Sequence, residues 1–158
     1  MRTYFIKILL VTIATLPFGA VNCQETKIRV IDSLKYVDKS DSLNSIYGQN
    51  KIIPDDLKLC CLIALSPYPE LSKSKIIFKK SKINTTLNAR PTLFSVLLKT
   101  RSNRSYIIRI NNSIKPHSVL IYDADFNAKI GLLGHELGHI CDYSRINIFG
   151  VVKRAFSY

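Results

Sequence analysis

The segment from Asp125 to Tyr143, DFNAKIGLLGHELGHICDY, constrains the fold more than any other part of the sequence. Asp125 is suited to cap a helix, and the apolar residues that follow recur with helical spacing through residues 126–143. Residues four apart lie on one side of an α-helix, so this segment is predicted to direct the imidazoles of His135 and His139 the same way.

Glu136 stands directly after the first of these histidines and is turned about 100° away from it around the helix axis. This H-E-x-x-H pattern suits metal-assisted hydrolysis, because zinc lowers the pKa of a water toward about 7 and a nearby carboxylate accepts its proton. Two incidental histidines are the alternative. The pattern is flanked by Leu133 and Ile140, however, and unpaired polar groups are costly to bury. We therefore predict that His135 and His139 bind Zn²⁺ and that Glu136 is the general base, although two histidines also accept other divalent ions.

The same residues carry a family resemblance. HELGH, which follows a strand-rich region and an apolar helical turn, resembles the zincin metallopeptidases, in particular the gluzincins. FNAKIGLLGHELGHICDY is also similar to a group of small secreted bacterial proteins with a G-H-E-L-x-H-x-x-D-Y signature. The resemblance implies zinc ligation by His135 and His139, catalysis by Glu136, and a peptide or protein substrate that pairs with an edge strand, expected at residues 104–112.

The third metal ligand is the point at which the sequence departs from the gluzincins, whose third ligand is a Glu on a later helix. No acid or histidine follows Asp142. Asp142 lies on the same helical side as the histidines, but about 4.5 Å beyond His139 along the axis, which favours a supporting or capping role over ligation. His117, in the loop IKPHSV, is a second alternative. The third, which we favour, is that the chain is a fragment and the ligand lies beyond it.

The rest of the chain predicts an α+β fold in which a small antiparallel sheet of three or four strands packs with a backing helix and the histidine helix. Pro54 opens the backing helix, at residues 54–66. Gly131, Gly134 and Gly138 predict that this helix or a strand closely approaches the histidine helix. The remaining expected elements are strands at 73–83, 91–100, 104–112 and 118–123, a hairpin formed by the second and third of these, and a helix opening within 146–158.

The first 23 residues predict a secretory signal peptide, since Arg2 and Lys7 precede an apolar run of about 14 residues, too short for a membrane span. We expect no transmembrane span in the mature chain, and a secreted or cell-envelope location. Cys23 stands where a lipidated cysteine would, but Asn22 before it does not fit a lipoprotein signal well. The predicted organisation is signal peptide 1–23, irregular arm 24–50, and zincin-like domain 51–158, incomplete at its C-terminus.

The formal net charge is +12, and its local concentration at residues 73–82 predicts a solvated basic strand rather than a specific nucleic-acid site. This charge also favours association with anionic envelope surfaces. Cys60, Cys61 and Cys141 do not form a disulfide framework and are predicted to be buried. The predicted function is a secreted zinc metallopeptidase. The alternatives are an inactive zincin-like scaffold that binds peptide or zinc, and a basic binder of nucleic acid or anionic glycans.

Overall fold

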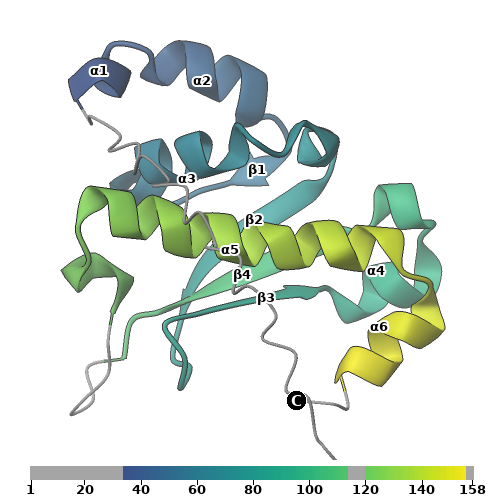
Figure 1. Ribbon diagram of the computed structural model, residues 1–158. Helices are drawn as coiled ribbons and strands as arrows, with labels where there is room; N and C mark the ends of the chain where they lie inside the picture. Colours follow the sequence, from purple (N-terminus) through teal and green to yellow (C-terminus); the bar gives the residue numbers. More distant parts are fainter. Residues whose placement is uncertain (1–33, 114–119, 156–158) are drawn as a thin grey trace, which may run out of the picture.

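The computed structural model describes residues 34–113 and 120–155 (Figure 1). The predicted signal peptide 1–23, Cys23 and His117 lie outside these residues. None of the described helices is both long and apolar enough to span a membrane. In chain order, the elements are α1 (Leu34–Val37), α2 (Ser40–Tyr47), β1 (Lys51–Ile52), η1 (Asp55–Leu57), α3 (Lys58–Leu65), η2 (Pro69–Leu71), β2 (Lys75–Ser81), β3 (Leu87–Pro91), α4 (Leu93–Leu98), η3 (Arg101–Asn103), β4 (Ser105–Asn111), η4 (Ile121–Asp123), α5 (Phe126–Arg145) and α6 (Ile148–Ala155).

The sheet has four strands in the order β1-β2-β4-β3. β1 pairs in parallel with β2, and β2 in parallel with β4, whereas β3 is antiparallel to β4. The predicted α+β class is confirmed, but the prediction of an antiparallel sheet is wrong because only the β3–β4 pair is antiparallel. The prediction that 104–112 is an edge strand is also wrong, since β4 lies between β2 and β3. β3 is the edge strand on this side of the sheet.

One face of the sheet packs against α3 and α5 to form the core. The buried apolar residues of β2 and β4 alternate along each strand, as Ile76 and Phe78 do in β2, so their side chains share one face. They belong to one cluster with residues of α3 and with Leu133, Leu137 and Ile140 of α5. Figure 1 shows α5 crossing in front of the sheet, with β3 at the sheet's lower margin. The two predicted helices at 54–66 and 126–143 are thus confirmed, the first beginning as the short helix η1.

The predicted strand at 91–100, and with it the predicted hairpin, is wrong. β3 ends at Pro91, and residues 93–98 form α4. The bonding to β4 ends with Thr92, whose N–H donates to the Ser105 carbonyl oxygen at 2.9 Å. Ser95 is buried, and its Oγ lies 2.8 Å from the carbonyl oxygen of Thr92 and 3.0 Å from that of Ser105, so local polar contacts favour a turn into a helix.

Two other segments differ from expectation. Residues 121–123, predicted to end a strand, form the short helix η4, while 118 and 119 lie outside the described residues. The arm predicted to be irregular contains α1 and α2 within residues 34–47, and α2 packs against α3. The strands predicted at 73–83 and 104–112 and the helix opening within 146–158 are confirmed as β2, β4 and α6.

Candidate metal centre

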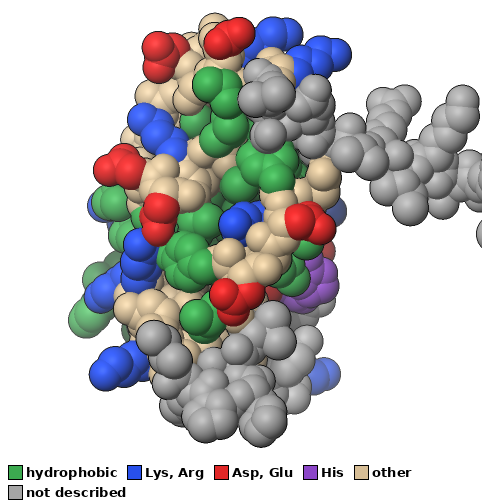
Figure 2. Space-filling view, turned by 90° about the vertical axis from the view of Figure 1, so that its left-hand side faces the viewer, with side chains coloured by type: hydrophobic (Ala, Val, Ile, Leu, Met, Phe, Trp, Pro, Cys, Tyr) green, Lys and Arg blue, Asp and Glu red, His purple; other side chains and the backbone are tan. Residues whose placement is uncertain are grey.

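The helix α5 that carries the histidines is defined by its cap and by its apolar side. The Asp125 carboxylate accepts a hydrogen bond from the backbone N–H of Ala128 at 2.7 Å, as an N-cap residue does. Leu133, Leu137 and Ile140 are fully buried. His135 is exposed and His139 half-buried, because both lie away from this apolar side. Figure 2 shows histidine side chains at the right-hand margin of that view, next to acidic side chains.

The two imidazoles face one another as the four-residue spacing predicts. The Nε2 atoms of His135 and His139 are 3.1 Å apart, and the ring centroids are separated by 4.6 Å with an interplanar angle of 80°. Two nitrogens bound tetrahedrally at the usual zinc–nitrogen distance would be about 3.3 Å apart. The donor set therefore fits a single zinc ion held by both Nε2 atoms.

Glu136 belongs to the same group. One ligand atom from each of His135, Glu136 and His139 lies within 4.8 Å of the others. Glu136 is more buried than His135 and lines a groove beside β3. A carboxylate in this position can reach a water near the two imidazoles.

The structure does not bring Asp142 into this group. Among residues 34–113 and 120–155, the two histidines belong to one group of side chains that could hold a metal ion. The third member of this group is Glu136. Asp142 is exposed on the next turn of α5. Because His117 is outside the described residues, the described part of the centre consists of two imidazoles and one carboxylate.

A groove of about 720 Å³ runs between α5 and the edge strand β3. Its α5 side carries Glu136, His139 and Tyr143. The other lining residues come from β3 and the segment after it, from β4 and from α6: Asn88, Ala89, Arg90, Pro91, Thr92, Leu93, Val96, Leu97, Ile107, Arg109 and Val151. The edge strand beside this groove is β3, and not the predicted 104–112.

Sequence reasoning missed β3 and α4 as parts of the groove. Two local signals pointed to them. Leu87 and Ala89 alternate with polar residues just before Pro91, a strand pattern, and both are buried. Leu93, Val96 and Leu97 then follow the i, i+3, i+4 spacing of a helix.

The loop after α3 holds the opposite side of α5. Tyr68 donates a hydrogen bond to the Gly134 carbonyl oxygen at 2.8 Å. The predicted close approach at the glycines is wrong for Gly131 and Gly134, where an added Cβ would meet nothing within 4 Å. At Gly138 the nearest atom to such a Cβ would be the Tyr68 Oη at 3.7 Å, an ordinary contact. Close packing therefore does not explain these three glycines.

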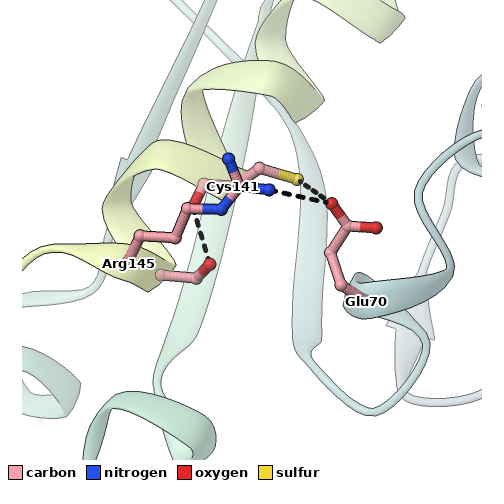
Figure 3. Close-up of polar contacts among 4 residues, drawn as sticks. Glu70, Cys141 and Arg145 are labelled. Atoms are coloured by element: carbon pink, nitrogen blue, oxygen red, sulfur yellow. Dashed lines mark hydrogen bonds and ion pairs between the residues drawn. The ribbon is translucent and has the colours of Figure 1, made fainter.

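Glu70 contacts α5 one turn beyond His139 (Figure 3). Its Oε1 accepts a hydrogen bond from the Cys141 thiol at 3.4 Å and lies 3.6 Å from an Arg145 Nη. Hydrogen bonds from its own backbone amide and from Cys141, with the charge of Arg145, lower the pKa of Glu70. Burial, the hydrogen bond with Glu70 and the Glu70 charge raise the pKa of Cys141 to about 12. Cys60, Cys61 and Cys141 are free and buried, which confirms the prediction for them.

Arg104 holds the C-terminal end of α5. Its side chain is buried, and its Nη1 donates to the carbonyl oxygens of Tyr143 at 3.1 Å and of Ile146 at 2.9 Å. Carbonyls at the end of a helix lack intrahelical donors, and a cation there is stabilising. Arg104 thus fixes the turn that carries Tyr143, a residue of the groove.

Comparison with known proteins adds no family assignment: no protein-family model matches the sequence, and no curated protein or solved structure is significantly similar to it. The resemblance to the zincins therefore depends on the H-E-x-x-H helix and its surroundings.

Proposed function

We propose that this protein is a zinc-dependent metallopeptidase in which His135 and His139 hold the ion. The observation that supports this most directly is the 3.1 Å separation of the two Nε2 atoms, with the Glu136 carboxylate in the same group. A bound zinc would supply a water of lowered pKa and polarise the substrate carbonyl. We also propose that the enzyme acts outside the cytoplasm, on the basis of the signal-like sequence at residues 1–23.

Glu136 would act as the general base. Its carboxylate would accept a proton from the attacking water and pass that proton to the amine released from the peptide bond. A general base must reach its proton donor directly or through one water. The ligand atoms of His135, Glu136 and His139 lie within 4.8 Å of one another, which is close enough for this. The partial burial of Glu136 keeps it next to the groove and away from bulk water.

The substrate would be an extended peptide that pairs with β3. In the described part of the chain, this strand bonds to β4 on one side and has no strand on its other side, so its outer backbone groups can pair with an added strand. The backbone groups of Asn88 and Arg90 face β4, in step with those of Thr86 and Thr92, so the outer groups are those of the alternate residues. Of these, Pro91 offers no N–H, so pairing would centre on Leu87 and Ala89. The groove between β3 and α5 has room for such a segment beside Glu136.

A non-catalytic scaffold that binds peptide or zinc is the second candidate. The observation that favours it is the donor set, since the described residues contribute two histidines where catalytic zinc sites usually have three protein ligands. Both candidates retain the same ligands and the same groove. They differ in the role of Glu136.

The Glu136→Gln variant separates the two candidates. We would measure zinc binding and the cleavage of a quenched fluorescent peptide library by this variant, by wild type and by Asp41→Asn, a control that removes an exposed acid on α2. For a peptidase, Glu136→Gln should retain zinc and lose about 10²–10⁴-fold in rate, whereas Asp41→Asn should leave the rate unchanged.

Zinc-loaded wild-type protein that cleaves no peptide of the library would favour the scaffold. Cleavage that Glu136→Gln leaves unchanged would contradict the proposed role of this residue. Nucleic-acid binding that persists after chelation and falls with added salt would support the third alternative, a basic binder.

A further inference from the structure

The helices α4 and α6 expose large apolar side chains next to one another. Four residues of α4 are exposed: Leu93 at 78%, Phe94 at 79%, Leu97 at 61% and Leu98 at 79%. Phe149 of α6 is 79% exposed, and the two helices contact each other. We call these five residues the apolar face. Single exposed apolar residues are ordinary, whereas a contiguous set of this kind marks an interaction surface.

A basic hollow adjoins the apolar face. It has a volume of about 580 Å³ and is lined by Lys73, Lys75 and Lys99 among other residues, none of which is acidic. Leu98 belongs to both the hollow and the apolar face. The hollow and the face therefore form one continuous surface, cationic at one end and apolar at the other.

The part of the sequence that contributes the hollow and α4 is basic. Residues 71–122 contain eleven Lys and Arg residues and no Asp or Glu, although the whole chain has eleven acidic residues. The segment 143–158, which includes α6, also lacks acids. A ligand for the surface must therefore carry negative charge for the lysines and an apolar part for the Leu and Phe side chains.

We propose that the apolar face and the basic hollow dock on an anionic lipid surface. The Leu and Phe side chains enter the boundary between headgroups and acyl chains, while the lysines of the hollow hold anionic headgroups. Lipid fits better than a second copy of the chain, because neither the hollow nor the apolar face offers an acidic side chain that could pair with the lysines of another copy. Nucleic acid would satisfy the lysines but would leave the exposed leucines without an apolar partner.

This docking would affect the groove beside the histidine pair. Leu93 and Leu97 belong to the apolar face and also line that groove. A protein bound to lipid in this way would hold the groove close to the membrane surface. The docking itself depends only on α4, α6 and the hollow, and is independent of the proposed peptidase activity.

The experiment is co-sedimentation of the full chain with vesicles of phosphatidylcholine alone or mixed with phosphatidylglycerol. Wild type should bind the mixed vesicles more tightly than the neutral ones, and added salt should weaken that binding. The Phe94→Ser/Leu98→Ser double variant should bind mixed vesicles at least about tenfold more weakly. Lys99→Ala should lose about fivefold, the value expected for one lysine near such a surface.

Matched controls come from α2 and the residue that caps it, which belong neither to the hollow nor to the apolar face. Ile46→Ser removes an apolar side chain that is 59% exposed, and Lys39→Ala removes an exposed lysine. Both should bind the mixed vesicles as wild type does. Thermal unfolding checks that every variant is folded. If the double variant does not fold, Lys99→Ala still tests the proposal.

Three results would overturn the proposal. One is equal binding of the mixed vesicles by wild type, the double variant and Lys99→Ala. Another is a stable dimer in solution that Phe94→Ser/Leu98→Ser dissociates, because the face would then be covered by a second copy. The third is binding to an oligonucleotide that Lys99→Ala weakens while vesicle binding does not change.

Discussion

Replacing Arg104 with Met should strongly destabilise the protein, because this side chain secures the end of the helix that carries the candidate metal ligands. Arg104 is only 3% exposed, and its Nη1 donates to the carbonyl oxygens of Tyr143 and Ile146 at 3.1 and 2.9 Å. Methionine preserves most of the apolar length of arginine but removes both donors. The two carbonyls would then be left partly buried without these partners.

The magnitude follows from two opposing contributions. A hydrogen bond that involves a charged group contributes about 1.5–3 kcal/mol to stability, and a cation at a helix C-terminus adds about 0.3–1 kcal/mol. Removing the buried guanidinium also removes its desolvation cost, which offsets part of the loss. We therefore expect the free energy of unfolding to fall by about 2–4 kcal/mol, and Tm to fall by roughly 5–15 °C.

The assay is urea unfolding followed by circular dichroism, with Arg101→Met as the matched control. Arg101 is exposed, and its Nη1 lies 3.5 Å from the Arg145 carbonyl oxygen, a marginal contact. The control should lose less than about 0.5 kcal/mol. If Arg104→Met is as stable as Arg101→Met, the buried guanidinium does not secure α5 and the reasoning is wrong.

Three further predictions concern the other contacts of α5. Tyr68→Phe removes the donor to the Gly134 carbonyl and should lower the free energy of unfolding by about 0.5–1.5 kcal/mol, measured by urea unfolding; an unchanged stability would mean that the bond contributes nothing. Gly131→Ala should raise it by about 1 kcal/mol, because the new methyl group meets nothing within 4 Å, and a loss of stability would contradict that geometry. Cys141, whose pKa is raised to about 12, should have roughly one thiolate in 10⁵ at neutral pH and resist iodoacetamide in peptide mapping; rapid native-state alkylation would count against its burial.

The histidine pair could be predicted from sequence because its geometry is local. Asp125 caps the helix, and the apolar residues after it fix which side is buried. The four-residue spacing then sets the separation of His135 and His139 through helix geometry alone. No contact distant in the sequence is needed to bring these two side chains together.

The groove could not be predicted, because it depends on strand order. The family resemblance implied an edge strand at 104–112, but β4 lies between β2 and β3, and this arrangement is set by pairing between segments far apart in the chain. The segment PTLFSVLLKT is equally apolar as a strand or as a short helix. The contacts of the buried Ser95 favour a helix, and the contact with Ser105 depends on how β4 is placed.

Zinc titration of the full chain against a competing fluorescent chelator tests the central claim most directly. Wild type and Glu136→Gln should bind a single zinc ion per chain with similar affinity, because Glu136 is assigned to proton transfer and both imidazoles remain. His135→Ala and His139→Ala should each lose that ion, and circular dichroism should show that both are folded. If either alanine variant binds zinc as tightly as wild type, the 3.1 Å pair of imidazoles is not a metal centre.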